Sequence, residues 1–240
     1  MSKKNPELQN KKNWRDRILT TVRLLLLVSL LLNLFFVGFE IFLDGAISKT
    51  KIFEELYKRM ELAFWTLVTL LLTFVPGYIR KHQKLNIPEI LEITIVLFVY
   101  AGMFFSVRFD MYYRFWWWDD LLHTLAGIVI GFASFIFMYK INLHYKLNIR
   151  PGFLAFLAFT IAVTAGVVWE ILEFTSDMLF KTAHQKWNLS ETEVMIGQSY
   201  QGNGLRDTMS DLIVNSIGAF FTSLFCYFLY KKEANENPIP

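Results

Sequence analysis

Cysteine is almost absent from this chain: Cys226 is the only one among 240 residues, and it lies in an apolar stretch. A single cysteine cannot form an intrachain disulfide, and a zinc site with four cysteine ligands is excluded as well. The sequence also lacks a G-x-G-x-x-G motif, a P-loop and a G-x-S-x-G nucleophile elbow. These absences argue against a disulfide scaffold, a nucleotide-binding enzyme of those types and a serine hydrolase.

Neither sign of charge dominates, because 24 lysines and arginines stand against 21 aspartates and glutamates and leave a formal net charge of +3. The basic residues are spread over several short connections between apolar stretches. A protein that binds nucleic acid would concentrate them in a patch or stripe. The distribution therefore argues against a nucleic-acid partner.

Apolar residues are abundant: 54% of the chain is hydrophobic and 17% is aromatic. Soluble domains contain about 45–50% apolar residues even when glycine is counted. A transmembrane helix needs about 20 mostly apolar residues, and six stretches meet this requirement. They lie at about 19–43, 61–79, 88–107, 120–139, 153–176 and 208–230. The sequence thus predicts an all-α fold, a polytopic membrane protein with six transmembrane helices.

The two ends of the chain are polar. Residues 1–18 form a basic leader, and residues 231–240 form a polar tail. No small-residue cleavage site follows the first apolar stretch, so we interpret it as a retained helix and not as a signal peptide. We expect a single transmembrane domain over 19–230, with a long outer loop at 177–207 that could act as a lid.

The basic residues also predict an orientation, since lysine and arginine collect on the cytoplasmic side of membrane proteins. If the N-terminus is inside, fifteen of the 24 lysines and arginines fall on the inner side and nine on the outer side. Every inner connection is then predominantly basic, while the outer ones carry mixed signs. We therefore expect both termini in the cytoplasm (N-in/C-in) and membrane lipids as the surroundings.

Acidic residues and one histidine gather at the outer ends of the last three predicted helices. Spacings of three and four positions place each set on one face of its helix. The sets therefore predict three polar stripes that reach the same depth of the membrane. They consist of Asp119, Asp120 and His123, of Glu170, Glu173 and Asp177, and of Asp207, Asp211 and Asn215.

Small residues continue these stripes toward the membrane interior, namely Gly127, Gly131, Ser134, Gly166, Gly218 and Thr222. Small side chains let helices approach closely in lipid, so we expect the three helices to be mutual neighbours. The ligand atoms of His123, Glu170 or Glu173, and Asp211 should then lie about 4–6 Å apart, since metal–ligand bonds are about 2.0–2.6 Å.

Seven carboxylates at three neighbouring helix ends repel one another and need a counter-charge. A divalent cation would stabilise several of them at once. Carboxylates with one histidine and no thiolate suit Mg²⁺, Mn²⁺ or Ca²⁺, and the histidine also allows Zn²⁺ or Fe²⁺. The predicted metal ligands are Asp119, Asp120, His123, Glu170, Glu173, Asp177, Asp207 and Asp211, with Glu173 and Glu170 as the candidate catalytic residues.

Simpler interpretations exist for several of these residues. Asp119 or Asp120 could cap a helix, and Asp207 could do the same for the last helix. The tryptophans at 116–118 are typical of an interfacial aromatic belt. The deeper carboxylates could form a purely structural network whose cations are Arg206, Arg108 or Arg114.

Three short motifs carry a resemblance over roughly residues 60 to 230. They are D-x-x-x-H-x-x-x-G from Asp119, W-E-x-x-E-F from Trp169, and a Q-G turn at Gln201 followed by D-T-x-S-D from Asp207. With these motifs the chain resembles the YjdF-like inner membrane protein family of bacteria. Relatives tend to carry an acid near Asn203 and a tryptophan near Arg206, where this chain departs. The resemblance implies a multi-pass protein of the bacterial plasma membrane and implies no reaction.

Three functions fit these observations. The first is a metal-dependent hydrolase or transferase that acts on a lipid or lipid-linked substrate from the outer leaflet. The second is transport of protons or divalent cations, although the polar stripes thin after Ser134, Thr164 and Asn215. The third is a structural membrane protein with a static metal or salt-bridge site. No feature of the sequence indicates an oligomeric state.

Overall fold

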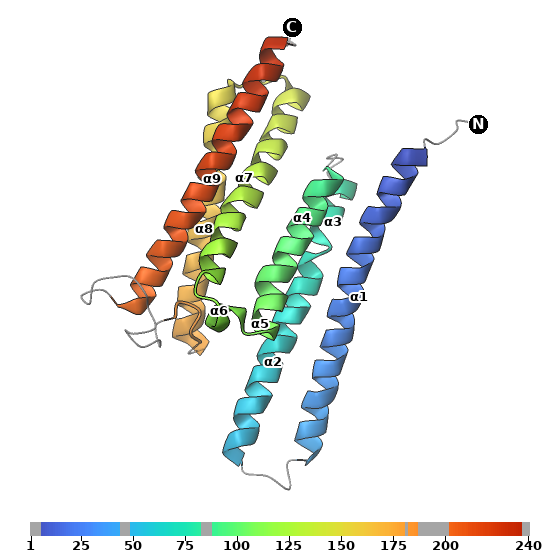
Figure 1. The fold of residues 1–240 in the computed structure, drawn as a ribbon, viewed down its shortest axis with the longest axis vertical. Helices are drawn as coiled ribbons and strands as arrows, with labels where there is room; N and C mark the ends of the chain where they lie inside the picture. The colour runs from blue at the N-terminus through green and yellow to red at the C-terminus, as the bar shows by residue number, and fades with distance from the viewer. Residues whose placement is uncertain (1–5, 44–48, 83–87, 181, 187–201, 237–240) are drawn as a thin grey trace. The chain divides into compact units, whose positions relative to one another are not determined.

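The computed structural model describes residues 6–43, 49–82, 88–180, 182–186 and 202–236 (Figure 1). These residues form helices and no strand, and six helical segments among them are long and apolar enough to cross a membrane. The predicted all-α fold with six spans is therefore confirmed. The chain divides into two compact units, residues 1–115 and 116–240, so the single six-helix domain stays a prediction.

The first unit is built on two long helices that pack against each other, α1 and α2. Its core contains Leu19, Leu26, Val96 and Phe104. Shorter helical pieces complete the second and third spans. The elements are α1 (Pro6–Leu43), α2 (Lys49–Leu72), α3 (Val75–His82), α4 (Glu89–Val99), the π-helical turn η1 (Tyr100–Phe105), α5 (Ser106–Arg108) and α6 (Met111–Arg114).

The second span is interrupted between α2 and α3, at Thr73 and Phe74. Arg23 binds this break: its Nη2 donates to the Thr73 carbonyl at 2.7 Å and its Nε to Thr73 Oγ1 at 3.2 Å. Pro76 and Gly77 follow this interruption and lie inside α3. Proline is tolerated there because the first turn of a helix has no intrahelical partner for its N–H.

A buried carboxylate, Glu92, occupies the interior of the first unit and is 1% exposed. Its Oε2 lies 2.9 Å from Arg80 Nη1 and 3.7 Å from Arg15 Nη1. Arg15 is itself buried and also contacts Asp16 and Glu89. Guanidinium groups from two other elements therefore neutralise Glu92, and we name Glu92, Arg80 and Arg15 the Glu92 ion-pair cluster.

The second unit is a three-helix bundle in which each helix packs against the other two. Its helices are α7 (Trp118–Tyr145), α8 (Pro151–Phe180) and α9 (Asn203–Glu236). Glycines let α7 and α9 meet backbone to backbone. A Cβ added at Gly127 would lie 2.2 Å from the Asn215 carbonyl oxygen, and one at Gly218 would lie 2.3 Å from that of Thr124. The predicted contact between the small-residue stripes of these helices is confirmed.

The opposite end of this bundle is held by Asn142, which is 2% exposed. Its Nδ2 donates to the Tyr230 hydroxyl at 3.1 Å, and its Oδ1 accepts from the Ile149 N–H at 2.9 Å. These bonds tie the end of α7 to α9 and to the turn before α8. The surrounding core includes Phe135 and Leu154.

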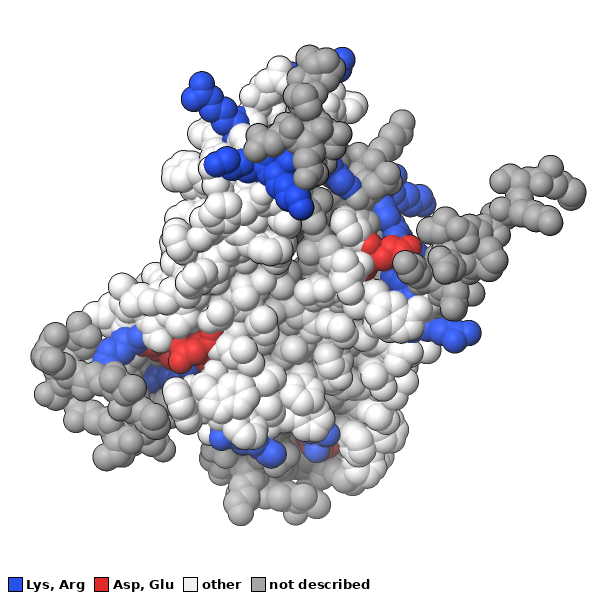
Figure 2. Space-filling model, turned by 45° about the horizontal axis from the view of Figure 1, so that its top comes forward, with Lys and Arg blue, Asp and Glu red and all other residues white. Residues whose placement is uncertain are grey.

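Large apolar side chains point outward from the helices, as expected for a surface that contacts lipid. Phe156 and Phe174 on α8 and Phe221 on α9 are among the exposed ones. On the face drawn in Figure 2, most of the described surface carries neither basic nor acidic side chains. Trp116 and Trp117 are also exposed, as the predicted interfacial belt requires.

Several helices continue beyond the predicted spans. α1 includes much of the leader, α8 runs to Phe180, and α9 begins at Asn203 and continues into the tail. Hydropathy marks only the apolar part of a helix, and a polar turn at either end still has its backbone hydrogen bonds within the helix. As a result, Asp177 and Asp207 lie inside helices and not in a loop. Residues 187–201 of the predicted lid lie outside the described residues.

Candidate functional site

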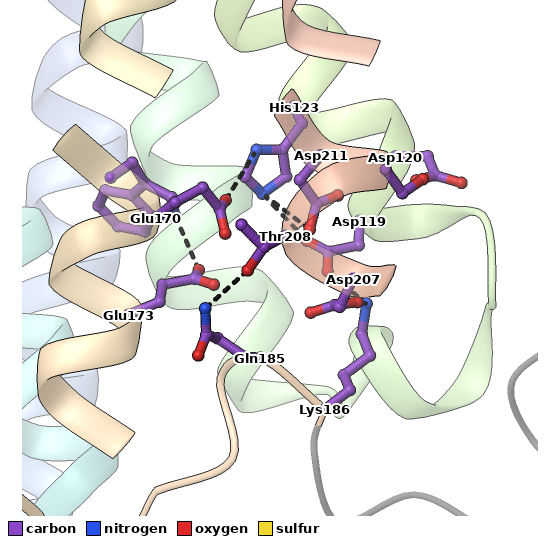
Figure 3. Close-up of polar contacts among 12 residues, drawn as sticks. Asp119, Asp120, His123, Glu170, Glu173, Gln185, Lys186, Asp207, Thr208 and Asp211 are labelled. Carbon is purple, nitrogen blue, oxygen red and sulfur yellow. Dashed lines mark hydrogen bonds and ion pairs between the residues drawn. The ribbon is translucent and has the colours of Figure 1, made fainter. Parts of the chain in front are cut away.

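The predicted polar residues meet at one end of the three-helix bundle, where α7 and α9 begin and α8 ends (Figures 1 and 3). Asp119 and His123 lie one turn apart on α7, Glu170 comes from α8 and Asp211 from α9. All four are buried, with exposures between 1% for Asp211 and 8% for Asp119. Three helices thus deliver ionisable side chains into a space from which solvent is largely excluded.

His123 lies at the centre of this group. Its Nε2 is 3.5 Å from Asp119 Oδ1 and 3.9 Å from Asp211 Oδ2, and its Nδ1 is 3.8 Å from Glu170 Oε1. One ligand atom from each of Asp119, His123 and Asp211 lies within 4.8 Å of the other two. His123 therefore lies near both Glu170 and Asp211 as expected, while the group within 4.8 Å contains Asp119 and not Glu170 or Glu173. The two ring nitrogens have different partners, so Glu170 faces the side of the ring opposite Asp119 and Asp211 (Figure 3).

Several buried oxygen atoms in this group have no hydrogen-bond partner within 3.5 Å among the residues that the structure describes. They are both carboxylate oxygens of Glu170, Asp211 Oδ2 and Asp207 Oδ2. Leaving a buried acceptor unsatisfied costs about 1–3 kcal/mol, and more when the group is charged. One turn farther along α9, both polar side-chain atoms of Asn215 also lack partners. The unsatisfied polar atoms thus come from α8 and α9, on the side of the bundle that His123 faces.

A lysine that the sequence does not single out reaches this group. The Nζ of Lys186 contacts the Asp119 carboxylate and lies 2.8 Å from Asp207 Oδ1. Burial by itself would lower the pKa of Lys186, but the carboxylates of Asp119 and Asp207 outweigh it and raise the pKa above the ordinary value for lysine. Lys186 therefore supplies one positive charge to these carboxylates. The sequence suggests Arg206, Arg108 or Arg114 as the cation of such a network.

Asp177 lies close to this group in the sequence but has a different role. Its carboxylate accepts hydrogen bonds from Thr182 Oγ1 at 2.6 Å, from the His184 N–H at 2.9 Å and from the Gln185 N–H at 3.0 Å. The Gln185 side chain also donates to Thr208 Oγ1 at 2.6 Å. These three partners of Asp177 lie in the segment 182–186 and hold the backbone that carries Lys186.

Asp120 and Glu173 lie at the margin of the group. Asp120 Oδ1 accepts a hydrogen bond from Ser210 Oγ at 2.9 Å, and Glu173 Oε1 accepts one from Trp169 Nε1 at 2.7 Å. Neither Asp119 nor Asp120 is the N-cap of α7, because Trp117 occupies that position without a side-chain cap. Asp207 is not a cap either, since α9 starts at Asn203.

Carboxylates outnumber cations in this site. Lys186 and a protonated His123 would together supply at most two positive charges. The carboxylates are Asp119, Glu170, Glu173, Asp207 and Asp211, which Figure 3 shows around His123. We name these five residues, His123 and Lys186 the carboxylate site. Such an excess of carboxylates at low solvent exposure is relieved either by protonation or by a bound cation.

Comparison with other proteins extends the similarity beyond residues 60 to 230. A protein of Thermotoga maritima described as uncharacterized is 25% identical over 154 residues, which cover 64% of this chain and 70% of that protein. No solved structure matches the chain significantly. A family model described as predicted membrane protein (DUF2238) matches residues 22–232, and the YjdF-like resemblance is consistent with it. Since that match covers all six spans in whole or in part, this chain belongs to the DUF2238 family of predicted membrane proteins.

Proposed function

We propose that this integral membrane protein binds a divalent metal ion through Asp119, His123 and Asp211. The observation that carries the proposal is the convergence of these three buried side chains, whose ligand atoms lie within 4.8 Å of one another. Two carboxylates and one imidazole suit Mg²⁺, Mn²⁺, Ca²⁺ or Zn²⁺. The unpartnered Asp211 Oδ2 gives the ion a ligand atom that no other described group uses.

Glu170 would position His123 in this arrangement. If His123 Nε2 binds the ion, Nδ1 carries the proton and faces Glu170 Oε1, which is 3.8 Å away. Metal-bound histidines almost always donate their second ring N–H to such a partner, which fixes the tautomer and the ring orientation. The sequence suggests Glu170 as a ligand or catalytic residue, and the geometry favours the positioning role.

The function that this site supports best is a metal-dependent hydrolase or transferase. A bound divalent ion polarises a scissile group and lowers the pKa of a water ligand. Glu173 follows Glu170 by less than one turn of α8 and is held by the Trp169 indole N–H. In our proposal the Glu173 carboxylate accepts the proton that the attacking water or hydroxyl loses.

A lipid or a lipid-linked molecule is the substrate class that fits the position of the site. The carboxylate site lies at the ends of three helices that are long and apolar enough to span a membrane, so it meets the headgroup region. The bias of basic residues supports our proposal that this end lies on the outer side of a bacterial plasma membrane. A cysteine introduced at position 184 should react with a membrane-impermeant maleimide in intact cells, and one at position 146 should not. The reverse pattern would move the site to the cytoplasmic leaflet.

Transport is less consistent with the packing of the bundle. Gly127 and Gly218 bring α7 and α9 into direct backbone contact just below the site, which leaves no room for a path between these helices. A static salt-bridge site is the second candidate, because Lys186 already pairs with Asp119 and Asp207. It leaves Glu170 and Asp211 Oδ2 unexplained.

Metal analysis of the purified protein tests the proposal. After incubation with Mn²⁺ or Zn²⁺ and removal of free ion, the wild type should retain about one ion per chain. Asp211→Asn should weaken binding by at least about 100-fold, since even partners outside the ligand set contribute about 10- to 100-fold. Asp110→Asn is the matched control, because Asp110 is exposed and lies in the other unit. A wild type that retains no ion, with an intact fold by circular dichroism, would leave the static salt-bridge site as the better account.

A further inference from the structure

The position proposed for the metal and the position of the Lys186 ammonium share one carboxylate. Lys186 Nζ contacts Asp119 through Oδ2, while Asp119 Oδ1 faces His123 Nε2 at 3.5 Å. The same ammonium lies 2.8 Å from Asp207 Oδ1. A divalent ion bound to Asp119, His123 and Asp211 would therefore lie next to an ammonium in a poorly solvated site. Like charges that close repel strongly when little water screens them.

The backbone places Lys186 in this position with some strain. Its φ is +47°, in the left-handed region that residues with a Cβ rarely adopt. The preceding residues are fixed independently of the ammonium, since His184 and Gln185 are held by Asp177 and Gln185 also binds Thr208. The Lys186 side chain is 18% exposed, so it reaches the site from the surface. Lys186 can thus leave Asp119 while the segment before it stays anchored.

We propose that Lys186 is an internal competitor for the metal ion. In the metal-free protein its ammonium occupies the carboxylates of Asp119 and Asp207 and supplies the counter-charge that they need. Metal binding displaces it from Asp119, so that the Lys186 side chain moves toward solvent and its backbone strain is relieved. The occupancy of the site is thereby coupled to the conformation of the chain around residue 186. This inference rests on the proposed metal site.

Two measurements on the full-length protein in detergent test the competition. The first is Mn²⁺ affinity. Lys186→Met keeps most of the side-chain volume and removes the charge, and it should tighten Mn²⁺ binding by about tenfold if the ammonium occupies the site about nine-tenths of the time. Lys231→Met, an exposed lysine near the other end of α9, should leave the affinity unchanged.

The second measurement is the reactivity of the Lys186 amine toward an N-hydroxysuccinimide ester, followed by mass spectrometry. Saturating Mn²⁺ should raise acylation of Lys186 severalfold in the wild type, because the displaced amine becomes accessible. The Asp211→Asn variant should show no such rise. This readout uses the wild-type lysine, so it remains decisive if Lys186→Met does not fold.

The outcomes separate the two proposals. If neither the wild type nor Lys186→Met binds Mn²⁺, the metal site itself is wrong. If both bind it with equal affinity and Mn²⁺ leaves the reactivity of Lys186 unchanged, the metal site stands and the competition is wrong. Tighter binding by Lys186→Met together with Mn²⁺-dependent acylation supports both.

Discussion

Buried carboxylates occur in both units, and their surroundings differ. Glu92 in the first unit lies 2.9 Å from Arg80 and 3.7 Å from Arg15, so its charge is neutralised by groups of the protein. In the second unit, Asp211 and Glu170 are similarly buried, yet Asp211 Oδ2 and both Glu170 oxygens have no hydrogen-bond partner within the described part of the chain. A buried acid can thus either be paired with cationic groups of the protein or lack such partners.

The difference shows which observation separates a structural acid from a functional one. An ion pair that is complete within the protein accounts for its own charges, and its removal affects mainly stability. A cluster with more carboxylates than cations must either hold protons or bind a cation, and our proposal assigns it a cation. The balance of charges and the number of unsatisfied oxygens therefore separate the two kinds of buried acid better than burial does. A glutamate-to-glutamine substitution should cost much stability in the first unit and little in the second.

The largest effect on stability is expected from Glu92→Gln. The change leaves Arg15 and Arg80 without their shared carboxylate, and breaking a buried pair on one side costs about 3–5 kcal/mol. We expect a loss near the lower value, about 3 kcal/mol, because Arg80 is 32% exposed and can be hydrated. Thermal or denaturant unfolding in detergent measures it.

Glu89→Gln is the matched control, since Glu89 is 43% exposed and its carboxylate lies 3.7 Å from Arg15, which also contacts Glu92. It should cost less than about 1 kcal/mol, as exposed ion pairs do. Equal losses from the two variants would show that the Glu92 ion-pair cluster contributes no more than a surface pair.

A smaller effect on stability is expected from Glu173→Gln in the second unit. The amide oxygen can still accept the Trp169 indole hydrogen bond, and glutamine has nearly the same volume as glutamate. We expect the free energy of unfolding to change by less than about 1 kcal/mol. Hydrolytic or transfer activity toward a labelled membrane lipid extract should be lost, because the proposed base is gone.

Glu173→Asp retains a carboxylate and should keep part of that activity. If Glu173→Gln instead destabilises the protein as much as Glu92→Gln does, the two units are alike and the carboxylate site is structural. An active, folded Glu173→Gln protein would transfer the role of base to another carboxylate.

The spans and the polar stripes could be predicted because both depend on local periodicity. A run of about 20 apolar residues identifies a membrane helix in any context, and a spacing of three or four places Asp119 and His123 on one face. The glycines also predicted the contact between helices, since Gly127 and Gly218 lie in apolar segments where small residues let helices approach closely. These signals brought together His123, Glu170 and Asp211 without any knowledge of the fold.

The remaining features depend on parts of the chain that have no periodic signal. Lys186 follows α8 in a non-helical segment, and nothing in its sequence neighbours shows that the backbone turns back toward Asp119. The side of His123 that Glu170 faces depends on the rotation of α8, which a spacing of residues leaves undetermined. The same holds for Asp177, whose partners become evident only when the course of segment 182–186 is known.

The backbone contact between α7 and α9 has a consequence for the choice of ion. These two helices supply Asp119, His123 and Asp211, and the nearest atoms that face Gly127 and Gly218 belong to the backbone of the other helix. The spacing of the three ligands is therefore fixed by main-chain atoms in van der Waals contact. A coordination shell that cannot widen selects ions by radius, whereas a flexible shell adapts to many. In our proposal, Gly127 and Gly218 would thereby limit the radius of the bound ion although they lie about one and two helical turns away from His123 and Asp211.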